Sequence, residues 1–483
     1  MSTSLSTNPI FLFLKNYNNK KMKRIFIFIF CTLLTLTVSA QTSETNKAID
    51  SRYHPAANRA AHAVVQTKYT ADPAPMVYNG RIYLYTTHDE DSADNFIMKD
   101  WLLYSSDDMV NWTDHGVVAS LKDFAWRSRD NGAWAEQVVE RNGKFYMYCP
   151  LHGHGIGVLV ADSPYGPFKD PIGKPLVWQK EHWYDIDPTV LIDDDGQAYM
   201  YWGNPNLYSV KLGEDMISTV GDIVEHPHIQ DYQEGPWIWK RNGHYYLAFA
   251  STCCPEGIGY AMSNSPMGPW KYKGDIMRHT PRTRGNHPGI IDYKGHSYVF
   301  GLNYDILRLE TNVHHERRNC SVAEMFYNAD GTIVEVPYFG DTSMEQLGAL
   351  NPYQRVEAET MSWGYGLKTE PLPSRNGVPN LCVTAIDEGD TLLVRGVDFG
   401  KKGPHRFIAS VASLKGNATI ELHLDSSHGP LVATLPVKAT GSERQFVTLK
   451  TKVDDVKGKH DVAFLFTGKA KKDLFRWDWW RLK

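Results

Sequence analysis

Short stretches of alternating apolar and polar residues recur through the first two-thirds of the chain, and no helical pattern of comparable strength interrupts them. Each stretch follows an Asn-Gly, Asp-Gly or Lys-Gly pair, which is typical of a tight β-hairpin because such turns need positive φ angles. Successive copies start 63, 53, 47 and 52 residues apart. The five copies occupy residues 79–85, 142–148, 195–201, 242–248 and 294–300. A period near 50 residues predicts the blades of a five-bladed β-propeller, whereas a sandwich would not explain a fivefold repeat.

The last third of the chain, residues 353–483, lacks that phrase and carries longer alternating strands separated by short turns. This pattern predicts a β-sandwich of the jelly-roll type. The chain is therefore expected to be all-β, with a five-bladed propeller over residues 55–340 and a β-sandwich over residues 353–483. Residues 340–352 form the expected linker.

The N-terminus predicts a signal peptide over residues 1–40. Four basic residues between Lys20 and Arg24 precede an apolar run that ends in the small-residue pattern Val-Ser-Ala40. The run is too short and wrongly flanked for a membrane span. Met22 would make a natural start. A secreted or periplasmic protein, cleaved near Ala40, is the expected outcome.

Charge and cysteine content narrow the function classes. The net charge is −4, with acids and bases well mixed, so no basic stripe for nucleic acid is apparent. Aromatic residues make up 12% of the chain, which suits sugar binding, although all-β proteins are rich in aromatics in any case. The cysteines of the mature chain match no zinc pattern. Cys253 and Cys254 could pair with each other or with distant partners, but buried free thiols are expected at all five positions, which are Cys149, Cys253, Cys254, Cys320 and Cys382.

Acidic residues stand at equivalent places in the repeat, just before the innermost strand of a blade. Since repeats preserve position, these side chains should meet at one end of the propeller axis. Crowded carboxylates raise one another's pKa, so one stays protonated while another is ionised. Glycoside hydrolysis requires that division between an acid and a base. An Asp-Pro pair alone is more often a turn former, but three acids in register favour catalysis. The residues are Asp72, Asp187 and Glu234, with Glu136 and His287 in the remaining two blades.

Three spaced motifs within residues 55–340 resemble glycoside hydrolase family 43: Tyr69-Thr-Ala-Asp72-Pro, Asp185-Ile-Asp187-Pro-Thr and Glu234-Gly-Pro236. The resemblance implies an inverting hydrolase of xylosidic or arabinofuranosidic bonds in plant cell-wall polysaccharides. It gives Asp72 the role of general base and Glu234 that of general acid. It makes Asp187 the residue that tunes the pKa of Glu234 and orients it.

The resemblance also extends to residues around these acids. It places His287 on the propeller axis beside a structural calcium. Trp134 could stack on the sugar or pack in the core. Arg317 and Arg318 could reach a carboxylate or a sugar hydroxyl, with at least one of them expected on the surface. The family often has Trp-Ala-Pro where this chain has Trp134-Ala-Glu136, so an added acid could alter substrate contacts.

The two ends of the last third, Val356-Glu357-Ala-Glu359 and Phe475-Arg-Trp477-Asp478-Trp-Trp480, resemble carbohydrate-binding module family 6. In that family acids near both ends hold a structural calcium, which implies Glu357, Glu359 and Asp478 as its ligands. The module could bind sugar or serve only as a brace. Candidate stacking residues, each equally well placed for the core, are Trp363, Tyr365 and Trp477.

The motifs favour a glycoside hydrolase over two other functions. A β-xylosidase or α-L-arabinofuranosidase is favoured over an endo-acting xylanase or arabinanase. A non-catalytic sugar-binding propeller would lack at least one acid, and none is missing. A phosphorylase would need a basic phosphate site beside the acid, and no convincing cluster is present.

Overall fold

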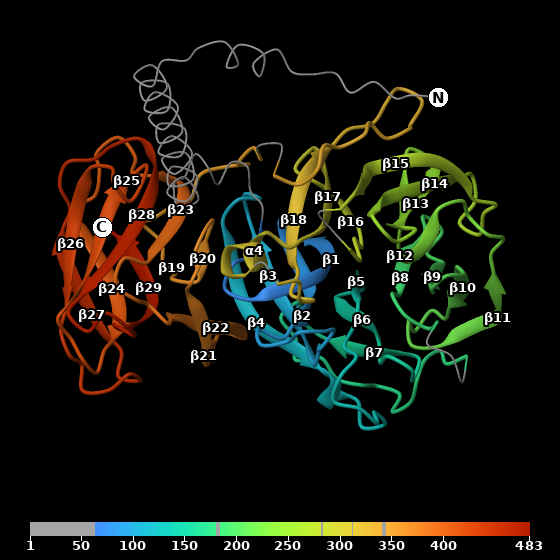
Figure 1. The fold of residues 1–483 in the computed structure, drawn as a ribbon, viewed down its shortest axis with the longest axis horizontal. Helices are drawn as coiled ribbons and strands as arrows, with labels where there is room; N and C mark the ends of the chain where they lie inside the picture. The colour runs from blue at the N-terminus through green and yellow to red at the C-terminus, as the bar shows by residue number, and fades with distance from the viewer. Residues whose placement is uncertain (1–62, 180–183, 282–283, 312, 341–343) are drawn as a thin grey trace, which may run out of the picture. The chain divides into compact units, whose positions relative to one another are not determined.

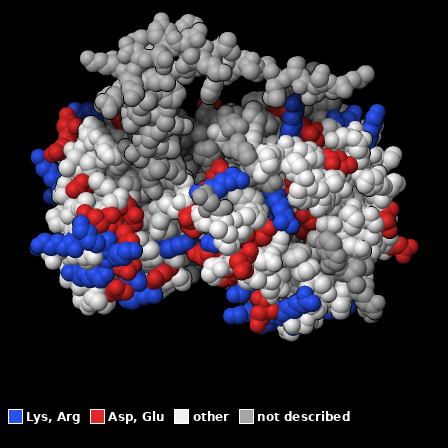
Figure 2. All heavy atoms as spheres, viewed as in Figure 1, with Lys and Arg blue, Asp and Glu red and all other residues white. Residues whose placement is uncertain are grey.

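A computed structural model describes residues 63–179, 184–281, 284–311, 313–340 and 344–483. Over these residues the chain is all-β, as predicted: its helical elements are α4 (Asp305–Glu310) and a 3-10 turn, η1 (Leu121–Asp123). No helix within the described part is long and apolar enough to cross a membrane. The predicted signal peptide, with Met22 and Ala40, lies outside the described residues. Acidic and basic side chains are interspersed over the face shown in Figure 2, in keeping with the small net charge.

Five antiparallel sheets follow one another from blue to yellow in Figure 1, each built from consecutive strands. At four of the five predicted hairpins the residue before the turn glycine has a positive φ, as the sequence required. The first sheet contains β1 (Tyr69–Tyr78), β2 (Arg81–Asp89), β3 (Asp100–Ser106) and β4 (Trp112–Ser120); the second β5 (Gln137–Arg141), β6 (Lys144–Pro150) and β7 (Ile156–Ala161); the third β8 (Thr189–Ile192), β9 (Ala198–Trp202), β10 (Tyr208–Leu212) and β11 (Thr219–Glu225); the fourth β12 (Tyr232–Arg241), β13 (His244–Ser251), β14 (Glu256–Ser263) and β15 (Lys271–Thr280); the fifth β16 (Gly289–Tyr293), β17 (His296–Asn303) and β18 (Asn319–Met325).

The second strands of these sheets, such as β2 and β9, are buried on both faces because each sheet packs against its neighbours. In β2, Leu84 shares a core with Phe300 of the fifth sheet, whereas Tyr85 shares another core with Phe145 of the second sheet. Shared cores likewise join the second sheet to the third, the third to the fourth and the fourth to the fifth. The succession of sheets therefore returns to its starting point.

Bulges interrupt the first strand of two sheets close to its start. The register of β1 against β2 shifts between Ala71 and Ala74, and that of β12 against β13 shifts after Glu234. Asp72 lies in the first bulge, with a φ of 51°. A bulge leaves a residue unpaired and re-aims its side chain. The local backbone thus turns Asp72 away from the ladder, whereas Glu234 pairs with Ala250 between two register shifts.

The C-terminal residues form two further antiparallel sheets that enclose one core. Trp477 and Trp480 lie in that core and contact Phe464 from the facing sheet. The first sheet has the order β21 (Lys368–Arg375), β22 (Val378–Thr384), β29 (Arg476–Leu482), β24 (Arg406–Ala412) and β27 (Val447–Lys452), with β19 (Val356–Glu357) on β29; the second has the order β23 (Thr391–Asp398), β28 (Lys459–Gly468), β25 (Ala418–Leu424) and β26 (Leu431–Val437).

Backbone contacts join these C-terminal sheets to the first of the five. The short strand β20 (Thr360–Met361) adds to the edge of β4 as a fifth strand. The turn between β3 and β4 also carries Asn111, whose amide accepts from the N–H of Arg395 at 2.8 Å and donates to its carbonyl at 2.9 Å. The turn between β3 and β4 therefore contacts the C-terminal part.

Candidate active site

The three predicted acids and His287 meet at one pocket of about 270 Å³. Asp72 comes from β1 and Glu234 from β12, while Asp187 and His287 directly precede β8 and β16. Each of the four residues thus belongs to a different sheet. Residues separated by more than 200 positions in the sequence come together here because their sheets begin at the same place.

His287 lies between the three carboxylates. Its Nδ1 is 3.3 Å from Asp72 Oδ1, and its Nε2 is 3.4 Å from Glu234 Oε1 and 3.8 Å from Asp187 Oδ2. Asp72 and Glu234 therefore lie at opposite nitrogens of one imidazole ring. The ring separates the two acids and gives both a common cationic neighbour.

The glycine of the Glu-Gly-Pro motif makes this packing possible. The N–H of Gly235 donates to Asp187 Oδ2 at 3.0 Å. Gly235 has a φ of +58°, and a Cβ there would lie 2.7 Å from Cγ of His287. A larger residue would have to displace the imidazole ring. The motif thus fixes Asp187 and His287 as well as Glu234.

Arg318 and Thr87 hold the carboxylate of Asp72. Arg318 Nη1 lies 3.3 Å from Asp72 Oδ1, and the Thr87 hydroxyl donates to Asp72 Oδ2 at 2.9 Å. Arg318 is itself fixed by two hydrogen bonds to the fully buried Asp89, at 3.0 and 2.9 Å. Arg317 points elsewhere and donates to a backbone carbonyl at 3.2 Å. Of the two candidate arginines, only Arg318 reaches the site. Sequence reasoning missed Thr87, which donates to Asp72, and Asp89, which binds Arg318.

Burial and mutual repulsion separate the proton affinities of these groups. Burial raises the pKa of Asp187 to about 7; the charge of His287 opposes the rise, and the charges of Glu234 and Asp72 add to it. Burial works against protonation of His287, but Asp187, Asp72 and Glu234 together raise the pKa of His287 to about 10. Of the three predicted acids, Asp187 therefore has the raised pKa.

Glu234 has the opposite shift. Burial alone would raise its pKa, but the hydrogen bond and charge of His287, together with a hydrogen bond from Asn204, bring the pKa of Glu234 below its ordinary value. Asn204 follows β9 and donates its side-chain amide to Glu234 Oε2. In the free pocket His287 therefore carries a proton next to the ionised Glu234, while Asp187 is close to half protonated at pH 7.

Trp134 and Glu136 face different spaces. Trp134 lines the 270 Å³ pocket. Its ring also stacks on the ring of His152, with the ring centroids 3.8 Å apart, so Trp134 both packs against a neighbour and faces the pocket. Glu136 instead lines a cavity of about 20 Å³ that it shares with Asp72 and His287. Neither carboxylate oxygen of Glu136 has a hydrogen-bond partner on any other described residue. Burial, with the charge of Asp72 adding, raises the pKa of Glu136 well above its usual range.

The acids predicted to hold calcium near the ends of the C-terminal sheets have other partners. Arg355 donates to Glu357 at 2.6 and 2.8 Å and to Asp478 at 2.9 Å. Glu359 is buried and accepts the N–H of Leu381 at 3.2 Å. The three acids do not form a group of ligand atoms within 4.8 Å of one another.

The aromatic candidates of the C-terminal part are core residues or lie against the core. Trp477 is fully buried in the core between the two sheets. Trp363 packs with Tyr69 and Tyr304 of the first part of the chain, and Tyr365 lies beside it. The core alternative is therefore correct for Trp477.

The cysteines divide into two kinds. Cys149, Cys320 and Cys382 are buried free thiols, as expected. The same expectation is wrong for Cys253 and Cys254, which form a disulfide with each other. The two cysteines are adjacent in the loop that joins β13 to β14, and Cys253 lines the 270 Å³ pocket.

Carboxylates with divergent proton affinities, converging on a pocket of this size, define a glycosidase site, since an acid and a base must act on either side of one glycosidic bond. A family model described as Glycosyl hydrolases family 43 matches residues 61–333, and one described as Carbohydrate binding module (family 6) matches residues 357–483. The chain belongs to glycoside hydrolase family 43.

Known relatives agree with this assignment. The chain is 35% identical to an arabinoxylan arabinofuranohydrolase of Paenibacillus polymyxa, over 87% of this chain and 74% of the relative. It is 33% identical to a xylosidase/arabinosidase of Bacteroides ovatus, over 56% of this chain and 96% of the relative. Among solved structures, the family 43 arabinoxylan arabinofuranohydrolase of Bacillus subtilis, in complex with cellotetraose, is 32% identical. The superposition covers 90% of this chain and 99% of the Bacillus subtilis structure, with a TM-score of 0.78.

Proposed function

We propose that this glycosidase removes arabinofuranosyl groups from arabinoxylan by an inverting mechanism. The observation that carries the mechanism is the placement of Asp72 and Glu234 at opposite nitrogens of His287. Inverting enzymes keep their two carboxyls about 6.5–9.5 Å apart to admit a water molecule, and the intervening imidazole ring keeps Asp72 and Glu234 from lying side by side. The substrate rests on the relatives that match both parts of the chain. Removal of xylosyl groups is the second candidate, because relatives of the first part alone are named for both sugars.

Each acid then has one task. Asp72, held by Thr87 and the positive charge of Arg318, accepts a proton from the attacking water. The water oxygen bonds to the anomeric carbon as the glycosidic bond breaks, and Glu234 gives its proton to the leaving oxygen. Glu234 is ionised in the free pocket, so it takes up this proton from its neighbours. Protonated His287 lies 3.4 Å away, and Asp187, with a pKa of about 7, lies behind it.

The five sheets are the blades of a propeller, and the C-terminal pair is a sandwich. Supporting this, every sheet shares a core with the next and the fifth shares one with the first. The domain boundaries proposed are residues 55–340 and 353–483. The sandwich serves to hold the enzyme on plant cell-wall polysaccharide.

A structural calcium belongs on the propeller axis. The 20 Å³ cavity has room for one water-sized species, and the unpartnered carboxyl of Glu136 fits a hard cation that prefers oxygen ligands. Glu136 would hold the ion, with His287 beside it, and the charge of the ion would offset the crowded acids. In the sandwich the arrangement does not fit a calcium, since Arg355 already supplies the positive charge between Glu357 and Asp478.

The protein is proposed to be secreted. The pattern of basic and apolar residues before Ala40 supports a signal peptide. The Cys253–Cys254 disulfide supports the same location because disulfides persist in oxidising compartments.

The decisive experiment follows the sugar released and its anomeric form. Arabinoxylan oligosaccharides and the para-nitrophenyl derivatives of α-L-arabinofuranose and β-D-xylose are incubated with the enzyme and with its Glu234→Gln variant, and early products are identified by proton NMR. We expect arabinose with inverted configuration, and a loss of about 10²–10⁴-fold in kcat in the variant. Retention of configuration would contradict the mechanism. Release of xylose alone would contradict the substrate, and full activity of the variant would contradict the role of Glu234.

A further inference from the structure

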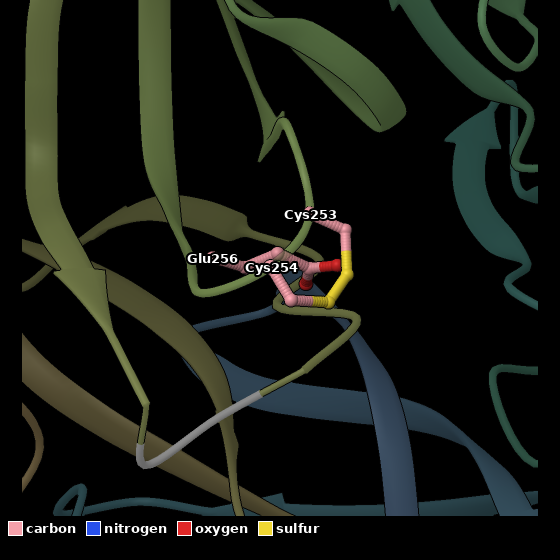
Figure 3. A group of neighbouring side chains, drawn as sticks. All are labelled: Cys253, Cys254 and Glu256. Atoms are coloured by element: carbon pink, nitrogen blue, oxygen red, sulfur yellow. A yellow bond between two sulfur atoms is a disulfide. The ribbon is translucent and has the colours of Figure 1, made fainter.

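A disulfide between neighbouring residues forms part of the pocket wall, and none of the roles above uses it. Cys253 and Cys254 lie in the loop that joins β13 to β14, and their sulfurs are bonded to each other (Figure 3). Cys253 lines the 270 Å³ pocket together with Glu234 and Glu256. Cys254 is exposed, so the bonded pair is not enclosed in the core.

The loop is fastened to the strand that carries Glu234. The N–H of Cys253 donates to Oε1 of Gln233 at 2.7 Å, and Gln233 directly precedes the proposed acid. On the other side of the loop, the carbonyl of Pro255 pairs with Nδ1 of His279 at 2.9 Å, while Nε2 of His279 pairs with Asp231 at 2.9 Å. The disulfide therefore has a fixed place beside the catalytic strand.

The chemistry of this wall differs from that of the carboxylates around it. Two bonded sulfurs carry no charge and no hydrogen-bond donor, and they offer a soft, polarizable, apolar surface. Figure 3 shows the carboxyl of Glu256 directed toward them, and its oxygen and both sulfurs lie within 4.8 Å of one another. Glu256 Oε2 accepts the N–H of Asn286 at 2.8 Å, which fixes the carboxyl in the wall. An apolar surface edged by a hydrogen-bonding oxygen matches a sugar, whose C–H face is apolar and whose rim is polar.

We propose that the Cys253–Cys254 disulfide is a sugar-binding surface of the pocket, against which the C–H face of the bound substrate rests beside Glu234, while the carboxyl of Glu256 receives one of its hydroxyl groups. The inference rests on the proposed glycosidase function of the same pocket. It makes the disulfide a determinant of substrate affinity, with no part in proton transfer. Reduction would separate the sulfurs and remove the rigid surface without altering any carboxylate.

The test compares wild type with the Cys253→Ala/Cys254→Ala double variant on arabinoxylan oligosaccharides, each with and without the reductant TCEP. We expect the double variant to raise KM about tenfold with kcat changed less than about threefold, because only binding contacts are lost. TCEP should raise the KM of wild type in the same direction and leave the double variant unaffected. The double variant is the matched control for the reductant, since it retains Cys149, Cys320 and Cys382. A Glu256→Gln variant, which keeps its shape and one acceptor oxygen, should show a smaller rise in KM.

Peptide mass spectrometry after alkylation without reductant reports whether the two sulfurs are bonded, and thermal melting reports whether the double variant is folded. Unbonded cysteines in the secreted enzyme, or an unchanged KM in both the double variant and the reduced wild type, would overturn the inference. If the double variant does not fold, the reduced wild type alone decides, through its KM. Failure here is distinguishable from failure of the proposed function: in the first case Glu234→Gln is still inactive, and in the second it is not.

Discussion

The acids of the pocket and the acids near the ends of the sandwich are alike in the sequence and differ in their surroundings. In the pocket, Asp72, Asp187 and Glu234 share one imidazole, and the pKa of Asp187 rises to about 7. In the sandwich, Glu357 and Asp478 flank the guanidinium of Arg355. Crowding buried carboxylates is costly, so a cluster of acids that converges on a pocket and shares one imidazole is retained for its chemistry rather than for stability. Glu357 and Asp478, which flank one guanidinium and do not line that pocket, have a structural role.

Removal of one carboxylate charge from the pocket and one from the sandwich tests whether the acids of the two regions differ in function. Asp72→Asn keeps the hydrogen-bonding shape but removes the oxygen that accepts the proton of water, so kcat/KM should fall about 10²–10⁴-fold. Glu357→Gln, its matched control in the sandwich, should leave kcat/KM within about twofold. Initial rates on the para-nitrophenyl arabinofuranoside measure both. Equal losses in the two variants would mean that the acids of the pocket and of the sandwich do not differ in kind.

Two glycines with positive φ, at the two ends of β12, test whether the pocket depends on its packing. Gly235→Ala would place a Cβ 2.7 Å from His287, whereas Gly243→Ala, in the hairpin turn, meets nothing within 4 Å. Both variants carry backbone strain of about 1 kcal/mol, but only Gly235→Ala displaces the imidazole. A misplacement on the order of 1 Å can cost about 10²-fold in rate, so kcat/KM should fall by that amount in Gly235→Ala and remain near wild type in Gly243→Ala. A comparable loss in both would assign the effect to strain alone.

The sequence predicted the parts of this site that repeat and missed the parts that do not. Asp72, Asp187, Glu234 and His287 were found because the hairpin phrase placed them at equivalent positions. Asn204 was missed because it follows a second strand, outside the phrase.

Pairs of residues far apart in the sequence could not be predicted, for a related reason. Arg318 and Asp89 are 229 residues apart, so only the folded chain shows that they bind each other. In the sandwich, the motif predicts Glu357 as a calcium ligand. It does not reveal that Arg355, two residues earlier, already forms an ion pair with the Glu357 carboxylate. Fold class follows from periodicity, whereas the charge state of an acid depends on neighbours that periodicity does not reveal.

Asp114 of β4 is a buried acid with a cationic partner, and we expect it to contribute to the free energy of unfolding. Asp114 accepts hydrogen bonds from Lys68 at 2.9 Å and Thr369 at 2.7 Å. Burial works to raise its pKa, but the charge and hydrogen bond of Lys68 and the bond from Thr369 hold the pKa of Asp114 below the ordinary 3.8. Removing one partner of such a buried pair costs about 3–5 kcal/mol, so Asp114→Asn should lower the stability at pH 7 by that order.

The sign of its pH dependence follows from the lowered pKa. The stabilisation is fully present above pH 3.8 and is lost as the pH falls through the pKa of the folded protein. Urea unfolding curves of wild type and Asp114→Asn should therefore be well separated at pH 7 and converge below pH 3.8. Asp107→Asn, which breaks an exposed pair with Arg81 on the same sheet, should cost less than about 1 kcal/mol. A gap between Asp114→Asn and wild type that persists into acid would contradict the assignment.

The smallest expected effect separates the two candidate calcium sites. If the axial cavity holds the ion through Glu136, chelation should lower the melting temperature of wild type by about 2–4 °C, as for a loss on the order of 1 kcal/mol. Glu136→Gln should abolish that response, because the unpartnered carboxyl is the ligand that the cavity offers. Glu357→Gln should retain it, because its carboxylate is already paired with Arg355. Scanning calorimetry with EDTA and with added calcium measures all three proteins. The reverse outcome, a response lost in Glu357→Gln and kept in Glu136→Gln, would place the cation in the sandwich and would show that Arg355 gives way to it.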